Sequence, residues 1–185
     1  MTRLLILDGD DRGPGTPLDR AIAGLQAEAL GRGDACERIR LAGLTLHQCV
    51  GCFGCWLKTP GRCRLRDDGP RLLRAVVGAD LLVFASPLRM GFTSALLKRA
   101  TDRLIPVVLP YIEVVGGESH HVPRYGRGFD LALLVERGDA TSDEVEATEA
   151  IYRRLARNMR GAFAWSRDTA ALAEREEERD AVHAA

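Results

Sequence analysis

Four cysteines that could bind a metal lie in one short segment of the chain. They are Cys49, Cys52, Cys55 and Cys63, and their spacing is C-x2-C-x2-C-x7-C. Cubane iron–sulfur clusters take four thiolate ligands, and the cysteines of bacterial ferredoxins are grouped in a comparable run. The glycines at positions 51 and 54 have no Cβ atom and would let the backbone pass close to inorganic sulfide. The spacing predicts a cysteine loop at 46–66 that binds a metal centre, with a 4Fe-4S cluster as the first interpretation.

The same cysteines have two other interpretations. Tetrahedral thiolate sites also bind zinc, although structural zinc sites usually consist of two separated C-x2-C pairs. The thiols could also be small buried apolar groups without a metal. Cys36 lies apart from the other four, near the start of an expected strand, and is predicted to be a core residue.

Two further segments could hold a cofactor. The first joins an expected strand to an expected helix, and its candidate binding residues are Gly9, Asp10, Arg12, Gly15 and Thr16. Backbone N–H groups and the helix dipole at such a turn attract a phosphate. Asp10 and Asp11 oppose this interpretation because carboxylates repel a phosphate dianion. The alternative is an ordinary turn in which the aspartates favour the bend.

The second segment follows the most apolar run of the chain and comprises Pro87, Leu88, Arg89, Met90, Gly91 and Phe92. Gly91 would let a flat ring approach the backbone, and Met90 or Phe92 would pack on that ring. The alternative is that these side chains only cover the end of the sheet.

Strand and helix patterns alternate along the whole chain. Apolar runs predict strands at 3–8, 36–41, 81–87, 129–136 and 162–166. Helical spacing predicts helices from 17, within 67–80, at 93–104 with Thr93 as the cap, at 141–159 and at 168–182. This order predicts one α/β domain, residues 1–185, with a five-stranded parallel flavodoxin-like sheet of order 2-1-3-4-5 and helices on both faces. The segment 106–128 has no clear pattern and is expected to be a long loop.

Composition excludes several classes of partner and location. Twenty-six basic and 26 acidic residues give a formal net charge of zero, which argues against a nucleic-acid-binding protein. No apolar stretch approaches the roughly 18 residues of a membrane span. The apolar run from Leu4 to Leu7 is too short for a signal peptide, so we expect a cytoplasmic protein with reduced thiols.

Two stretches of sequence resemble a known family. They are CVGCFGCWLKTPGRCRLRDD and ADLLVFASPLRMGFTSALLKRATDRL, within a resemblance that runs from about residue 3 to residue 137. Together they are similar to the NAD(P)H-dependent FMN reductase and iron–sulfur flavoprotein branch of the flavodoxin-like superfamily. The resemblance implies that the four cysteines of the loop ligate a 4Fe-4S cluster near FMN. It also implies that 87–92 holds the isoalloxazine ring, that 9–16 holds the FMN phosphate, and that the protein is a homodimer or homotetramer.

The chain departs from this family at two places. Asp10 and Asp11 stand where a serine and a proline are usual, and Arg89 stands where an aromatic residue is often found.

In the segment 116–128, His120 and His121 are candidate proton donors to a reaction at the flavin. The alternative for this segment is a subunit contact.

The same segment holds two candidate substrate-binding residues, Arg124 and Tyr125.

The leading hypothesis for the function of the chain is an FMN-dependent oxidoreductase that takes electrons from NAD(P)H and passes them to a quinone, a nitroaromatic compound or a protein acceptor. The alternatives are a non-enzymatic electron carrier with both cofactors, and a flavin-free metal-binding or regulatory module.

Overall fold

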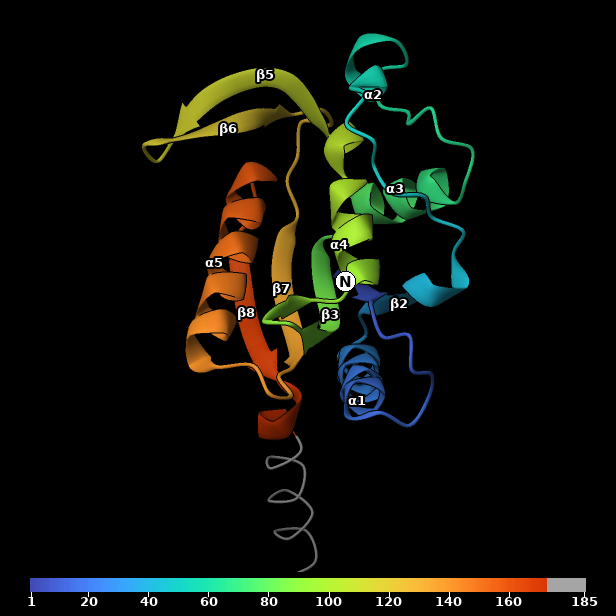
Figure 1. Cartoon of the computed structure of the whole chain (residues 1–185), viewed down its shortest axis with the longest axis vertical. Coiled ribbons are helices and arrows are strands. Elements are labelled where there is room, and N and C mark those ends of the chain that lie inside the picture. The colour runs from blue at the N-terminus through green and yellow to red at the C-terminus, as the bar shows by residue number, and fades with distance from the viewer. Residues whose placement is uncertain (173–185) are drawn as a thin grey trace, which may run out of the picture.

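The computed structural model describes residues 1–172. Its central sheet contains five parallel strands. They are β1 (Arg3–Asp8), β2 (Ala35–Arg40), β3 (Leu81–Arg89), β7 (Asp130–Glu136) and β8 (Phe163–Asp168). Their spatial order is β2-β1-β3-β7-β8, and every pairing between them is parallel (Figure 1). Numbered among themselves, these strands have the predicted order 2-1-3-4-5. The flavodoxin-like α/β architecture is therefore confirmed, with one additional short strand described below.

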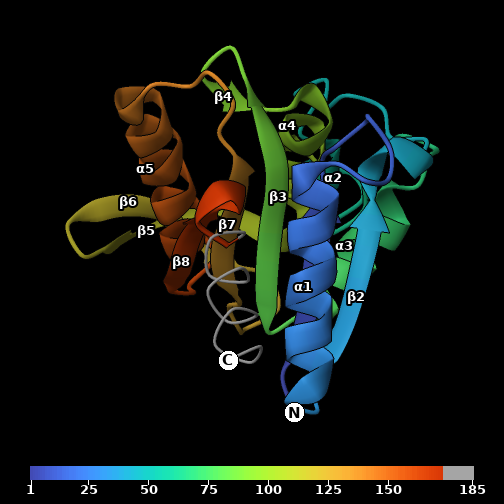
Figure 2. The same ribbon diagram turned by 90° about the horizontal axis from the view of Figure 1, so that it is seen from below.

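Helices cover both faces of this sheet (Figure 2). One face packs against α1 (Pro17–Gly31) through alternate residues of β1, β3 and β7. The other face packs against α3 (Gly69–Gly78), α4 (Ala95–Asp102) and α5 (Ser142–Asn158) through the intervening residues of the same strands. Successive side chains of a strand point to opposite faces, so strands buried on both sides are apolar throughout.

Side-chain caps fix where the helices begin. The Thr16 hydroxyl accepts a hydrogen bond from Asp19 N at 3.1 Å, as the Thr-Pro start of α1 predicts. Thr93 was the expected cap of the helix at 93–104, and this expectation is wrong. Thr93 belongs to the extra strand β4 (Phe92–Thr93), which pairs antiparallel with β3, and the hydroxyl of Ser94 caps α4 instead.

The segment 106–128, expected to be a loop, contains a β-hairpin. After the short helix η2 (Ile105–Val107), β5 (Val108–Val115) and β6 (Glu118–Pro123) pair antiparallel outside the main sheet. Gly116 and Gly117 form the two-residue turn with φ angles of 58° and 81°, as a primed turn requires. Few of its residues are buried, so the hydrophobic pattern on which a sequence prediction depends is absent.

The cysteine loop lies between η1 (Leu41–Gly43) and α3 and contains one short helix, α2 (Gly54–Leu57). Figure 1 shows α2 near the start of the β5–β6 hairpin. The final helix predicted over 168–182 lies mostly outside the described residues. Within the described part of the chain, no helix has both the length and the apolar character needed to cross a bilayer.

Candidate functional site: a cysteine cavity and a pocket at the sheet edge

All four predicted metal ligands line one small cavity. Its wall consists of the four cysteines of the loop together with Val50, Gly51, Phe53, Leu65 and Ile105. Burial raises the pKa of the Cys55 thiol, and the nearby thiols of Cys63, Cys49 and Cys52 raise this pKa further. The four sulfur atoms therefore share one site, while Cys36 lies on β2 outside it.

The backbone of the loop turns sharply between the first and third cysteines. Gly51 has a φ of 62° and Phe53 a φ of 51°, both in the left-handed region. A bulky residue such as phenylalanine rarely adopts this conformation, so the surrounding contacts must hold it there. The turn places Cys55 on α2 and directs it back towards Cys49 and Cys63, which line the same cavity.

Trp56 fastens this turn to the β5–β6 hairpin. Its indole Nε1 donates to Val108 O at 2.9 Å and to Ile105 O at 3.2 Å. Its ring stacks on Phe53 with centroids 5.3 Å apart and meets the His121 ring at 5.0 Å. A partly buried indole usually finds a hydrogen-bond partner, and here that partner positions the loop.

A buried ion pair holds both ends of the cysteine loop. Arg103, at the end of α4, donates to Asp67 at 2.6 and 2.9 Å and to His47 O at 2.7 Å. The side chains of Arg103 and Asp67 are 1% and 0% exposed. The Arg103 guanidinium lowers the pKa of Asp67 far below its ordinary value, so the carboxylate stays ionised. A Cβ atom on Gly69 would lie 2.3 Å from Arg103 Nη2, which explains the glycine at the start of α3.

Two types of metal centre place different demands on the four thiols. A single zinc ion needs its sulfur ligands at about 2.3 Å from one point. In a cubane cluster each thiolate binds a different iron. Within residues 1–172, no three Cys, His, Asp or Glu side chains converge closely enough to hold a single ion.

The residues predicted to act beside the flavin lie at the cysteine end of the molecule. His120 and His121 are in β6, where His120 approaches Glu118 at 3.2 Å. His121 packs on Trp56, and its Nδ1 has no hydrogen-bond partner within the described chain. Neither histidine lines the pocket beside the ring segment 87–92, so their role as proton donors stays a prediction.

Arg124 and Tyr125 brace the cysteine loop. The Arg124 guanidinium donates to Pro106 O at 2.8 Å, and both side chains lie against Gly61. The substrate-binding role of this pair stays a prediction. The contacts that both side chains make are with Gly61 of the cysteine loop, and Arg124 also contacts Pro106.

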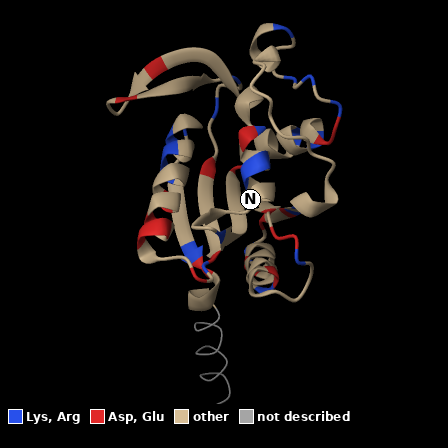
Figure 3. Ribbon diagram, in the orientation of Figure 1, with Lys and Arg blue, Asp and Glu red and all other residues tan. Residues whose placement is uncertain are grey.

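At the carboxyl edge of the sheet, the loop 9–16 forms a dense ionic network. Arg12 pairs with Asp10 at 2.7 Å and with Glu136 at 2.6 Å. Burial alone would raise the pKa of Asp10, but hydrogen bonds from Arg12 and Thr16 outweigh it and lower the pKa to about 2. Figure 3 shows an acidic stretch followed by a basic one on the loop that leaves β1. The guanidinium of Arg12, which was predicted to bind a phosphate, is therefore already paired with two carboxylates.

Gly9 has a packing role that differs from the predicted one. A Cβ atom at this position would lie 2.8 Å from Leu97 Cβ and from Ser94 Oγ. Gly9 O accepts a hydrogen bond from the Ser94 hydroxyl at 2.7 Å, which ties the end of β1 to the start of α4. Gly15, with a φ of 86°, supplies the left-handed turn before α1.

The segment 87–92 forms a tight hairpin. Leu88 pairs with Thr93 and Arg89 with Phe92, and the turn residues Met90 and Gly91 have φ angles of 52° and 73°. The Met90 side chain is fully exposed at the tip, and Phe92 packs on the core. The close approach expected at Gly91 is made by a side chain of α5, because a Cβ atom there would lie 2.4 Å from a carboxylate oxygen of Glu144.

A polar pocket of about 410 Å³ lies between this hairpin and the end of β7. Its lining comprises Arg12, the residues 87–91, Glu136, Gly138, Asp139, Ala140 and Glu144. Its volume is in the range of small-molecule sites. The predicted ring segment therefore borders a pocket, together with carboxylates that sequence analysis missed because they come from β7 and α5.

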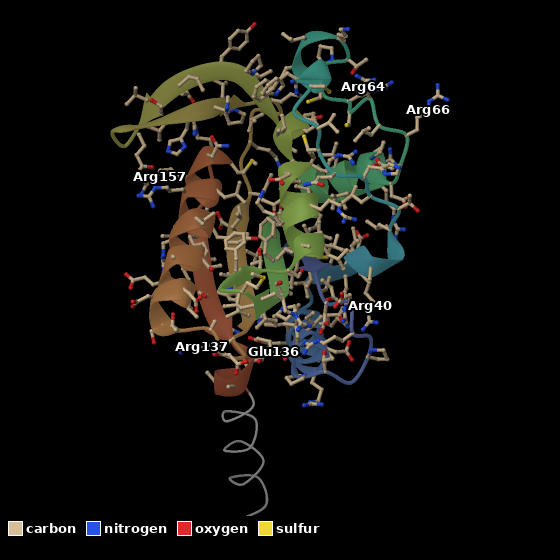
Figure 4. The ribbon with its side chains drawn as sticks, in the orientation of Figure 1. Arg40, Arg64, Arg66, Glu136, Arg137 and Arg157 are labelled. Atoms are coloured by element: carbon tan, nitrogen blue, oxygen red, sulfur yellow. The ribbon has the colours of Figure 1, made fainter. Side chains whose placement is uncertain are left out.

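The pocket and the cysteine cavity are far apart within one chain. Figure 4 places Arg64 and Arg66, beside the last cysteine, at one end of the molecule and Glu136 and Arg40 towards the other. The resemblance implied a cluster near the flavin. A single chain does not bring the two sites together.

Comparison with known proteins adds sequence and fold relationships. No protein-family model matches the chain. An iron–sulfur flavoprotein of Methanocaldococcus jannaschii is 38% identical over 71 residues, which cover 38% of this chain and 36% of that relative. The chain thus matches about a third of this relative's length.

Two solved structures share the fold at low identity. An FMN-dependent NADH-azoreductase from Bacillus anthracis in complex with FMN gives a TM-score of 0.58 at 14% identity, over 90% of this chain and 85% of that one. An NAD(P)H:quinone oxidoreductase from Methanothermobacter marburgensis gives 0.59 at 16% identity, over 90% and 82%. The predicted resemblance is confirmed: the chain is similar in sequence to iron–sulfur flavoproteins and shares the flavodoxin-like fold of FMN-dependent reductases.

Proposed function

We propose that this chain is a flavin-dependent NAD(P)H oxidoreductase with an iron–sulfur cluster bound by Cys49, Cys52, Cys55 and Cys63. The observation that carries the proposal is the cavity that all four cysteines line. The similarity to an iron–sulfur flavoprotein supports the cluster, and the fold shared with flavin-dependent reductases supports the flavin. When bound, a cluster would supply one-electron transfer and a flavin would exchange a hydride for single electrons.

The chain's own residues would bind and orient these groups. The Arg103–Asp67 pair and Trp56 fix the loop that carries the thiols, so the ligands are positioned before a cluster arrives. The pocket at the sheet edge would receive the flavin ring beside the hairpin 87–92. We propose a quinone, a nitroaromatic compound or a protein as the electron acceptor.

The phosphate of FMN does not fit the loop 9–16 as it is folded. Asp10 and Glu136 already occupy the guanidinium of Arg12, which was the predicted phosphate ligand. FMN stays the expected flavin by resemblance, in disagreement with the way this loop is folded.

The same disagreement favours a second candidate function, a flavin-free metal-binding or regulatory module. Flavin that copurifies at about one molecule per chain would exclude this candidate. A non-enzymatic electron carrier is the third candidate. Rapid oxidation of NADH or NADPH by the purified protein, with any of the proposed acceptors, would exclude a carrier role as the only function.

Serine substitution of single cysteines tests the cluster. We expect Cys49→Ser or Cys63→Ser protein, purified without oxygen, to lose most of its iron and its broad visible absorption. Wild-type protein should contain about four irons per chain. The matched control is Cys36→Ser, which removes a half-buried thiol outside the cavity and should leave the iron content unchanged. Equal iron in all variants, or one zinc per wild-type chain, would contradict the proposal.

A further inference from the structure

We infer that the loop 9–16 excludes the phosphate of FMN because the carboxylate of Asp10 already fills the anion position. The inference rests on the proposed flavin-dependent function and specifies its cofactor. The chain would hold a flavin through the ring and without a phosphate contact, so riboflavin would bind about as tightly as FMN.

Asp10 uses every kind of donor that such a loop offers to a phosphate. Its carboxylate accepts hydrogen bonds from Arg12 N at 3.0 Å, from Arg12 Nε at 2.8 Å and from Arg12 Nη2 at 2.7 Å. It also accepts one from the hydroxyl of Thr16 at 2.9 Å. A backbone N–H, a guanidinium and a hydroxyl are the groups that bind phosphate at helix starts. The Asp10 side chain is only 4% exposed, so it lies inside the loop.

Two other carboxylates accept hydrogen bonds from further N–H groups near the start of α1. Gly15 N donates to Asp19 Oδ2 at 2.7 Å, and Leu18 N donates to Glu136 Oε2 at 3.3 Å. Asp19 N donates to the cap hydroxyl of Thr16. The N–H groups that normally attract an anion to a helix N-terminus are therefore engaged by the chain itself.

The charge balance at this edge also opposes a phosphate. The carboxylates in the network outnumber the guanidinium groups by four to three; they are Asp8, Asp10, Asp19 and Glu136, against Arg12, Arg38 and Arg40. Arg38 bridges Asp8 and Asp19, each at 2.7 Å. A phosphate dianion would add negative charge to this network, in which each guanidinium already pairs with a carboxylate; the guanidinium of Arg20, outside the network, is exposed and donates to Gly15 O.

The neighbouring residue Asp11 provides a matched control. Asp11 carries the same charge on the same loop, but it is exposed and makes no side-chain hydrogen bond within residues 1–172. Asp10→Ser removes the internal carboxylate, keeps a hydroxyl and leaves room for an anion. Asp11→Ser removes the same formal charge without opening the anion position.

The experiment compares riboflavin and FMN as ligands of the full chain by quenching of flavin fluorescence. For the wild type and Asp11→Ser, we expect dissociation constants of the two flavins within about threefold of each other. For Asp10→Ser, we expect FMN to bind at least tenfold more tightly than riboflavin. The inference would be overturned if the wild type bound FMN at least tenfold more tightly than riboflavin. It would also be overturned if Asp10→Ser did not bind FMN more tightly, relative to riboflavin, than the wild type does.

A second measurement separates this inference from the proposed function. Inorganic phosphate should raise the thermal midpoint of Asp10→Ser and leave those of the wild type and Asp11→Ser unchanged. If no variant binds a flavin but only Asp10→Ser responds to phosphate, the proposed function fails and the exclusion of phosphate by Asp10 is supported. If no variant binds a flavin and Asp10→Ser does not respond to phosphate, both are overturned.

Discussion

At the scale of single residues, the buried carboxylate of Asp10 organises the carboxyl edge of the sheet. The Asp10 side chain is 4% exposed and ionised, with its pKa lowered to about 2 by Arg12 and Thr16 against the opposing effect of burial. The residue type was visible in the sequence as an obstacle to phosphate binding. Its burial and its four hydrogen bonds depend on how Arg12 and Thr16 fold back on it, which spacing alone does not determine.

The lowered pKa of Asp10 predicts an acid-dependent contribution to stability. A group whose pKa falls from 3.8 to about 2 on folding stabilises the protein above pH 3.8, and this stabilisation disappears as the pH falls towards 2. We expect Asp10→Asn to lower the free energy of unfolding by about 2 kcal/mol at pH 7, and much less near pH 2. Urea denaturation at a series of pH values measures this difference. Asp11→Asn should change it by less than about 0.5 kcal/mol, and a gap that does not depend on pH would contradict the assignment.

At the scale of elements, α4 contacts the cysteine loop and helps to hold it in place. Its first turn is tied to Gly9 through Ser94, and its last turn holds the loop ends through Arg103. One helix thus contacts both candidate sites from its two ends. The sequence predicted this helix and the loop separately, but the contact between Arg103 and Asp67 spans 36 residues and leaves no local pattern.

Arg103→Met tests the support of the cysteine loop. Removing one partner of a buried ion pair leaves an uncompensated charge, which costs about 3–5 kcal/mol. We expect the free energy of unfolding, measured in urea, to fall by about this amount, and the folded variant to retain less iron. Lys98→Met on the same helix is the control, because Lys98 forms an exposed i,i+4 pair with Asp102 and should cost less than about 1 kcal/mol. Equal losses in the two variants would contradict a special role for Arg103.

At the scale of the whole molecule, the two candidate sites face opposite ends of one chain. The cysteine end also exposes large apolar side chains: Val50, Phe53 and Leu57 of the loop, and Tyr111, Ile112 and Val114 of β5. Figure 3 shows that the β5–β6 hairpin carries few charged residues. Exposed large apolar side chains can contribute to protein contacts, and the homodimer or homotetramer expected by resemblance stays a prediction.

Val114→Lys tests whether this hairpin contributes to self-association. We expect light scattering after gel filtration to give a dimer or tetramer for the wild type and a smaller mass for Val114→Lys, because a buried charge weakens an apolar contact. Ile151→Lys is the matched control, since Ile151 is also an exposed apolar residue but belongs to α5 and not to the hairpin. A monomeric wild type, or equal masses for all three proteins, would contradict this role.

Local pattern in the chain was enough to predict the features that depend on neighbouring residues. Apolar runs identified the five parallel strands, Thr16 and Pro17 marked the start of α1, and the cysteine spacing identified the thiols that share a cavity. These features arise from residues close together in the chain, where periodicity and spacing act directly.

Contacts between segments far apart in the sequence are visible only in the tertiary structure. The exposed β5–β6 hairpin lacks a hydrophobic alternation, and its pairing becomes visible only when the strands lie side by side. Glu136 reaches Arg12 across 124 residues and Glu144 fills the space beside Gly91, so the edge predicted to receive a phosphate is occupied by carboxylates. The separation of the cysteine cavity from the pocket has the same origin, because contacts between distant segments set the distance between sites.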